Sequence, residues 1–155
     1  MSELDVRIVH LEPMRVAYAL GFGPSPEPIA WGKILDFGKA KGLLEDLDKV
    51  RFFGFNNPDP SPGTPNYGYE QWMTVGEEIE AEGDVGIKEF PGGLYAVTRF
   101  KDLNKIGQVW KQLVVWQEDS KYKHGNHQWL EEQLSPPDTP NFEDLVFDLY
   151  LPITE

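Results

Sequence analysis

Cysteine is absent from all 155 residues of the chain. Without thiols the chain has no disulfide, no thiolate nucleophile and no cysteine-ligated metal site. It also lacks an apolar run of about 18 residues and a basic, apolar N-terminal segment, so neither a membrane span nor a signal peptide is predicted. We therefore expect a cytoplasmic protein with no membrane partner.

Positive charge is scarce. The chain has 14 Lys and Arg against 26 Asp and Glu, which gives a formal net charge of −12. Such a surface repels phosphate backbones, so we expect no nucleic-acid partner. The charge is compatible with attraction of cationic small molecules, and equally with solubility alone.

The usual signatures of nucleophilic and cofactor chemistry are missing. No Gly-x-Ser-x-Gly elbow and no Gly-rich phosphate loop occur. His124 and His127 have an HxxH spacing, but no acidic or cysteine partner is placed to complete a metal site. We therefore expect no metal and no cofactor. The serines lie in the N-terminus, in loops or at a helix end: Ser2, Ser25, Ser61, Ser120 and Ser135.

Aromatic residues are abundant. Hydrophobic residues make up 40% of the chain, and it holds five Trp, six Tyr and nine Phe. A chain of this length buries well over half of its unfolded surface, which supports one packed domain. The aromatic side chains exceed what such a core usually requires. Some of them are candidates for lining a cavity, with core packing as the alternative for most.

The chain reads as two copies of one unit, the second starting 79 residues after the first. Residues 5–8 return as residues 84–87. Ala17 returns as Ala96, and the strand, turn, helix and loop signals recur in the same order. We expect a single domain over 1–155, with repeats of about 1–79 and 80–155. Such repeats bury a shared face, and the seam between them is a natural place for a concave binding site.

Hydrophobic periodicity predicts a β-α-β-β order in each half. The fold class we expect is α+β, with duplicated β-α-β-β units related by a pseudo-twofold. The antiparallel sheet would carry both helices on one face, and a pocket would lie between the halves. The predicted helices span about 29–47 and 103–117. The predicted strands span 6–11, 15–20, 51–55, 67–75, 85–90, 94–100, 128–134 and 145–153.

Several stretches together resemble the GyrI-like small-molecule-binding domains, also known as the effector-binding domains of AraC- and MerR-type regulators. In the second half they are 93–101 with a following helix, Trp129-Leu130-Glu131-Glu132-Gln133-Leu134, and Phe147-Asp148-Leu149-Tyr150-Leu151-Pro152-Ile153. In the first half, 12–18 and 67–70 look like the matching elements. The resemblance covers essentially the whole chain and implies the duplicated fold with a hydrophobic, aromatic-walled pocket.

Two positions depart from the family pattern. Asp102 stands in a turn where the family often has Gly. Gln133 stands two residues after the expected pocket glutamate, where the family tends to have an aromatic residue.

Glu131 is the sharpest candidate for the site. Strand alternation puts Glu131 and Gln133 on one face and Leu130 and Leu134 on the other. If the leucines face the helices, Glu131 faces the cavity, where a carboxylate among aromatic rings suits a cationic ligand. The resemblance implies the same role for Glu131. The alternative is a solvated strand residue, which the neighbouring Glu132 supports.

Five aromatic residues complete the predicted ligand site. Tyr150 is expected on the same side as Glu131, and Tyr69 on the equivalent face of the first half. Trp31 and Trp110 are repeat mates near the helix starts, and either wall the cleft or anchor helix to sheet. Phe52 is the repeat mate of Glu131 at the offset of 79. Ordinary packing is the alternative for the tyrosines.

The leading function is stand-alone binding of hydrophobic small molecules, cationic ones included, for sensing or sequestration. Because the domain fills the chain, no helix-turn-helix module is expected. The second hypothesis, implied by the resemblance, is a hydrolase of electrophilic toxic compounds. Glu131 would be its general base, assisted by Tyr150 or Tyr69. The third is a gyrase-inhibitor-like protein interaction.

Overall fold

The computed structural model describes residues 4–56 and 66–155. The Pro-rich stretch Asn57 to Pro62, which falls in a predicted loop of the first repeat, lies outside the described residues. The chain divides into two compact units. Unit 1 comprises Met1–Pro13 and Pro91–Glu155, and unit 2 comprises Met14–Phe90.

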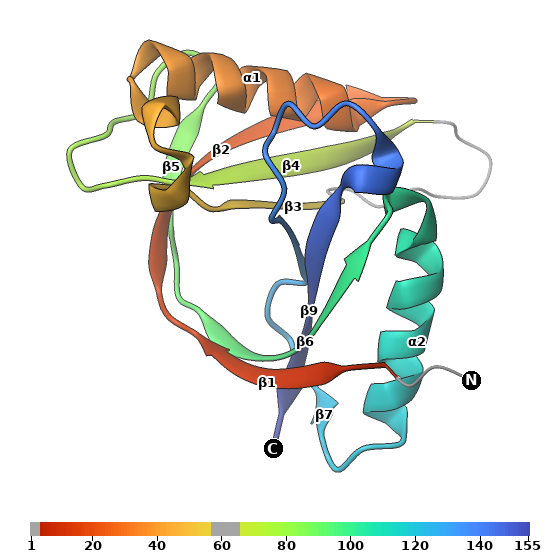
Figure 1. Cartoon of the computed structure of the whole chain (residues 1–155). Helices are drawn as coiled ribbons and strands as arrows, with labels where there is room; N and C mark the ends of the chain where they lie inside the picture. The colour runs from red at the N-terminus through yellow and green to blue at the C-terminus, as the bar shows by residue number, and fades with distance from the viewer. Residues whose placement is uncertain (1–3, 57–65) are drawn as a thin grey trace. The chain divides into compact units, whose positions relative to one another are not determined.

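Unit 2 is an antiparallel sheet with one helix. Its strands, in the spatial order β3-β4-β2-β5, are β3 (Phe52–Asn56), β4 (Tyr67–Thr74), β2 (Met14–Gly23) and β5 (Gly86–Phe90). Helix α1 (Pro26–Ala40) lies along the face of β2 and β4 (Figure 1). The core between helix and sheet contains Ala17, Ala19, Ile34, Phe37, Phe52 and Met73.

The ends of α1 differ from the sequence prediction for local reasons. Pro26 and Pro28 lie inside the first turn, where a missing backbone N–H costs nothing. The predicted extension to residue 47 is wrong, because the helix ends at Ala40 and Gly42 adopts a left-handed backbone with φ of +71°. Two short 3-10 turns follow, Leu43–Glu45 and Leu47–Lys49.

Unit 1 repeats the plan. Its strands, in the order β1-β6-β9-β8, are β1 (Val6–Leu11), β6 (Gly93–Lys101), β9 (Val146–Thr154) and β8 (Leu130–Gln133), and the short β7 (Lys123–His124) also pairs with β9. Helix α2 (Ile106–Glu118) packs on β6 and β9 (Figure 1). The core on this side contains Ala96, Val109, Leu113, Leu149, Leu151 and Ile153.

The first strand of each sequence half pairs with a strand of the other half. Strand β1 pairs with β6, so that Val6 lies opposite Thr98. Strand β5 pairs with β2, so that Ile87 lies opposite Ala17. The predicted α+β class, with antiparallel strands and two helices, is confirmed. The compact units differ from the predicted repeats of about 1–79 and 80–155, because unit 2 comprises Met14–Phe90. That the chain forms a single domain stays a prediction.

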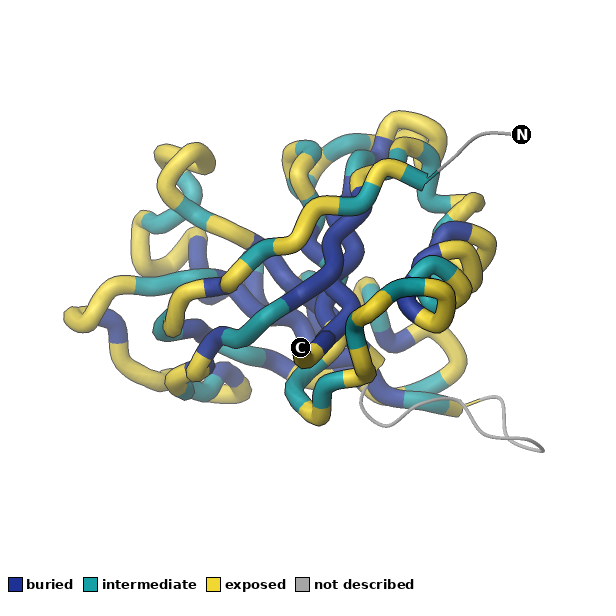
Figure 2. Tube along the Cα trace, turned by 90° about the horizontal axis from the view of Figure 1, so that it is seen from below, coloured by how far each residue is buried: buried dark blue, intermediate teal, exposed yellow. Residues whose placement is uncertain are grey.

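The central strands are buried on both faces. In β4 and β9 every residue except those at the ends is buried. In Figure 2 the buried segments follow the strands, whereas turns and the outer sides of helices are exposed. Each sheet therefore has a helix face and an opposite face, which we call the reverse face. Within the described residues, no helix is long and apolar enough to span a membrane.

The close approach of α1 to β2 requires Gly21. A Cβ there would collide with the carbonyl oxygen of Pro26 and lie 2.9 Å from the backbone nitrogen of Ala30. Because backbone cannot move aside as a flexible side chain can, we expect Gly21→Ala to lower the free energy of unfolding by about 3 kcal/mol in urea denaturation.

Gly32→Ala is the matched control. No atom lies within 4 Å of a Cβ at this helical position, so alanine should raise the free energy of unfolding by about 0.5–1 kcal/mol. Equal tolerance of the two substitutions would contradict the packing of α1 described above.

Candidate functional site

Glu131 lies on the helix face of unit 1. It is opposite Leu149 in the β8–β9 register, and Leu149 packs in the core beneath α2. Trp110 of α2 donates its indole N–H to Oε2 of Glu131 at 3.0 Å. The expected orientation, with Glu131 turned away from the helices, is therefore wrong.

Glu132 occupies the reverse face instead. It lies opposite Asp148 in the register and is only 5% exposed. The hydroxyl of Tyr150 donates to Oε1 of Glu132 at 2.7 Å. The prediction that Tyr150 shares a face with Glu131 is therefore wrong, because Tyr150 shares the reverse face with Glu132. The sequence argument assumed that the leucines of this strand face the helices. It failed because Leu130 points away from α2.

An aromatic wall adjoins this carboxylate. The ring of Tyr95 meets the ring of Tyr150 edge-on, with centroids 5.5 Å apart. Tyr95 is fully buried, and its hydroxyl donates to the carbonyl oxygen of Gln128 at 2.5 Å. Burial raises the pKa of Tyr95, because the phenolate would be desolvated. The reverse face thus places two aromatic rings beside the buried carboxylate of Glu132.

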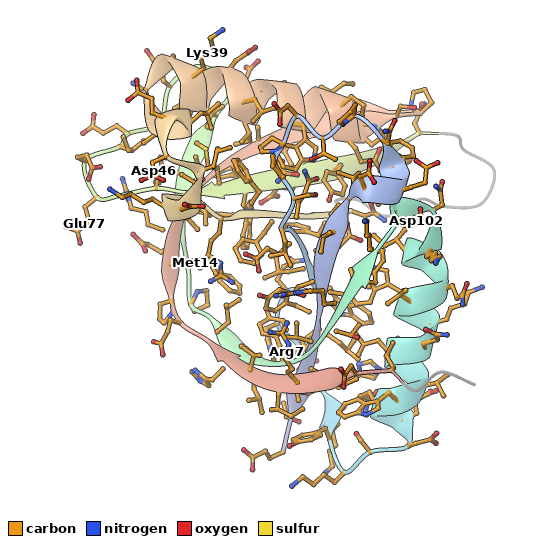
Figure 3. The ribbon with its side chains drawn as sticks, viewed as in Figure 1. Arg7, Met14, Lys39, Asp46, Glu77 and Asp102 are labelled. Carbon is orange, nitrogen blue, oxygen red and sulfur yellow. The ribbon has the colours of Figure 1, made fainter. Side chains whose placement is uncertain are left out.

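Asp148 on the same face is neutralised by two arginines. Arg7 of β1, labelled in Figure 3, donates to its Oδ2 at 2.8 Å. Arg99 of β6 donates to Oδ1 at 2.9 Å and to Oδ2 at 3.2 Å. The hydrogen bond and charge of Asp148 raise the pKa of Arg99, with smaller contributions from Glu132 and Tyr150. The guanidinium groups are half exposed, so much of their charge is hydrated.

The reverse face of unit 2 also carries a buried carboxylate. Glu70 of β4 accepts the indole N–H of Trp72 at 2.5 Å and pairs with the ammonium of Lys88. Trp72 is opposite Tyr18 in the register, on the face away from α1. Sequence reasoning missed Glu70, Trp72 and Lys88. These residues alternate along their strands with Met73 and Ile87, which pack toward α1. That alternation could have placed them on one face, but only if the pairing of β2, β4 and β5 had been known.

The two tryptophans of the predicted site anchor helices. Trp31 of α1 packs against Phe52, with ring centroids 5.2 Å apart. Trp110 of α2 packs in the same way against Trp129, at 5.4 Å. Phe52 therefore corresponds to Trp129 and not to Glu131. The offset of 79 fails here, because 20 residues separate Trp31 from Phe52 but only 18 separate Trp110 from Trp129.

Tyr69 lies on the helix face of unit 2. It alternates with Met73, which packs beneath α1, and its ring lies over Gly54, where a Cβ would come within 2.6 Å of a ring carbon. Tyr67, on the same face, donates its hydroxyl to Glu27 of α1 at 2.6 Å. The predicted equivalence of Tyr69 and Tyr150 is thus wrong. Ligand contact by any predicted site residue stays a prediction.

The two departures from the family pattern both have local roles. Asp102, labelled in Figure 3, adopts a φ of +88° in the turn before α2, a conformation that usually favours glycine. Its Oδ1 accepts the backbone N–H of Asn104 at 3.0 Å. Gln133 donates to the carbonyl oxygens of Ser135 and Pro136 at 3.3 and 3.2 Å. Both side chains hold backbone turns.

The two histidines of the HxxH spacing have separate surroundings. His127 donates from Nε2 to the carbonyl oxygen of Leu94 at 2.7 Å and packs edge-on against Tyr95. His124 stacks on Trp129. Across residues 4–56 and 66–155, no group of three His, Asp or Glu side chains is arranged to hold a metal ion.

Sequence comparison assigns the family. A profile of the GyrI-like small molecule binding domain matches residues 4–154. The chain belongs to this GyrI-like family. Comparison with curated protein sequences finds no match.

Solved structures share the GyrI-like fold. The C-terminal domain of EcmrR has a TM-score of 0.75 at 13% identity, over 98% of each chain. For EcmrR in its complex with DNA, the TM-score is 0.77 at 14% identity. The match includes 97% of our chain but only 57% of the EcmrR chain. A hydrolase from Listeria innocua has a TM-score of 0.67 at 12% identity, over 99% of our chain and 94% of its own.

A ligand-bound structure has the same fold. SAV2435 bound to tetraphenylphosphonium has a TM-score of 0.52 at 8% identity, over 97% of our chain and 94% of that chain. At these identities the likeness concerns the fold alone.

The buried phenol of Tyr95 gives a pH prediction. Around pH 10, the ordinary tyrosine pKa, Tyr95 should stay protonated in the folded state while the unfolded chain releases this proton. Stability from this group is therefore complete below pH 10 and falls as pH rises further. In an ultraviolet titration, wild type and Tyr95→Phe should have the same number of phenols that ionise near pH 10, because Tyr95 does not ionise there. One phenol fewer in Tyr95→Phe would contradict the burial of Tyr95.

Proposed function

We propose that this GyrI-like domain binds hydrophobic cations on the reverse face of unit 1. Glu132 would be the counter-ion, and Tyr150 would hold its carboxylate in place. The observation that carries the proposal is the bond of 2.7 Å from the Tyr150 hydroxyl to a carboxylate that is almost completely buried. The aromatic pocket that the family resemblance implies would be formed around this pair.

Geometry distinguishes Glu132 from the other carboxylate of this face. Asp148 has direct bonds to Arg7 and Arg99. Glu132 accepts the Tyr150 hydroxyl, a bond that holds its Oε1 beside the aromatic ring of that tyrosine. A buried carboxylate gains most from a cation that excludes water, because the local dielectric constant is low.

The neighbouring rings suit the apolar part of such a ligand. Tyr95 and Tyr150 are buried beside Glu132, and in the proposed complex their ring faces would each attract a cation by about 0.5–2 kcal/mol. The net charge of −12 raises the local concentration of cations. The family description as small-molecule binding, and the tetraphenylphosphonium bound to SAV2435, support the same ligand class.

Calorimetric titration with tetraphenylphosphonium separates the two adjacent glutamates. We expect Glu132→Gln to raise the Kd at least about tenfold, equivalent to about 1.4 kcal/mol, because the buried negative charge is lost. Glu131→Gln is the matched control, since Gln keeps an oxygen that accepts the Trp110 N–H. Its Kd should stay within about twofold of wild type.

A neutral aromatic compound completes the design. Its affinity should be equal for wild type and Glu132→Gln, because only the charge differs between these proteins. A tenfold loss for the cation in Glu131→Gln, with Glu132→Gln unaffected, would refute the assignment.

The same pair of side chains supports a second candidate, hydrolysis of a strained, electrophilic ring. Glu132 would take a proton from water as the water oxygen bonds to a ring carbon. The ring carbon–heteroatom bond would break, and the Tyr150 hydroxyl would protonate the leaving heteroatom. The hydrogen bond between Tyr150 and Glu132 is the observation in its favour.

Single-turnover kinetics with a strained-ring epoxide test this candidate. We expect loss of the epoxide with wild type and a loss of activity of at least about a hundredfold in Glu132→Gln. Retained turnover in that variant would exclude Glu132 as the base. The third expectation, a gyrase-inhibitor-like interaction, and the expected absence of nucleic-acid and membrane partners stay predictions.

A further inference from the structure

Lys88 points its ammonium group into a cage on the reverse face of unit 2. The nitrogen lies 4.5 Å from the ring centroid of Tyr18, 4.9 Å from that of Trp72 and 5.9 Å from that of Phe55. It also pairs with Oε2 of Glu70. These four side chains, from strands β2, β3 and β4, are called the ammonium cage below.

The cage is held together by contacts of its own. Trp72 donates to the same Glu70 oxygen that pairs with Lys88, and Phe55 meets Trp72 edge-on, at 5.2 Å and 87°. A Cβ at Gly86 would lie 2.6 Å from the Tyr18 ring, so only glycine leaves room for that ring against β5. The Glu70 side chain is 4% exposed, whereas the Lys88 side chain is 37% exposed.

We infer that the ammonium cage is a second cation site, selective for primary alkylammonium groups, and that Lys88 occupies it as a tethered internal ligand. A carboxylate together with aromatic faces is the chemistry that recognises an ammonium group. Because the Lys88 side chain is 37% exposed, we expect that shortening it opens the position of its ammonium group to solvent.

The tether determines which cations the wild-type protein accepts. An ammonium group attached to β5 has a high effective concentration at the cage, on the order of millimolar or above. Free alkylammonium ions at lower concentrations cannot displace it. Lys88 thereby neutralises Glu70 and keeps unit 2 from competing for cations. The inference uses no residue of the Glu132 site, so it stands or fails independently of the proposed function.

Chemical rescue tests the inference. Lys88→Ala leaves Glu70 without its ammonium partner, so the Tm should fall, and n-butylammonium chloride should restore it with a half-maximal concentration on the order of millimolar. The same concentration of sodium chloride should not restore it. Wild type should gain no more from butylammonium than from sodium.

Two double variants locate the rescue. Lys88→Ala combined with Glu70→Gln should lose the response, because the cage no longer carries a negative charge. Lys88→Ala combined with Glu132→Gln should keep it, which separates this site from the one proposed in unit 1. A Tm of Lys88→Ala that responds equally to butylammonium and sodium would overturn the inference.

A nuclear magnetic resonance measurement that keeps Lys88 tests the inference even if Lys88→Ala does not fold. Reductive methylation with ¹³C-formaldehyde labels every lysine, and Lys88→Arg assigns the Lys88 signal. Ring currents should shift this signal upfield from those of exposed lysines, and Tyr18→Leu should reduce the shift. A Lys88 signal that coincides with the exposed lysines would overturn the cage.

Discussion

The carboxylates buried on the reverse faces need partners nearby, and this requirement determines which charged side chains lie around them. Both faces of β4 and β9 are buried, so Glu70 and Asp148 can stay ionised only with close partners. Each obtains them from other strands of its own unit, Lys88 of β5 for Glu70 and the arginines of β1 and β6 for Asp148. Glu132, buried on the same face as Asp148, accepts the hydroxyl of Tyr150. We propose Glu132 as the counter-ion for an external cation because this bond holds its carboxylate beside the rings of Tyr150 and Tyr95.

The duplicated scaffold carries different chemistry in its two units. By register, Asp148 corresponds to Glu70, Tyr150 to Trp72 and Glu132 to Phe55. The helix faces have diverged less, since Trp31 with Phe52 and Trp110 with Trp129 anchor the two helices alike. The reverse faces have each acquired a separate set of charged and aromatic side chains. Duplication thus preserved the packing of helix on sheet while the opposite faces specialised.

Local sequence predicted the elements better than it predicted which way their side chains face. Strand β1 was predicted with its observed bounds, because its ends follow from local breaks such as Pro13. The sequence around Leu130 could not show which side chains of β8 face the helix. Their orientation depends on the pairing of β8 with Leu149 and Tyr150, which are distant in sequence. The exchange of β1 and β5 between the sequence halves also depends on long-range pairing. Hence the glutamate on the reverse face is Glu132, one residue after the Glu131 that the sequence favoured.

The central claim is that a cation binds beside Tyr95 and Tyr150, on the reverse face of unit 1. Intermolecular nuclear Overhauser effects between a bound aromatic cation and assigned ring protons test it most directly. The account predicts cross-peaks to the rings of Tyr95 and Tyr150 and none to the indoles of Trp110 and Trp129. Cross-peaks to those indoles, with the tyrosines silent, would move the site to the helix face beside Glu131 and contradict the account.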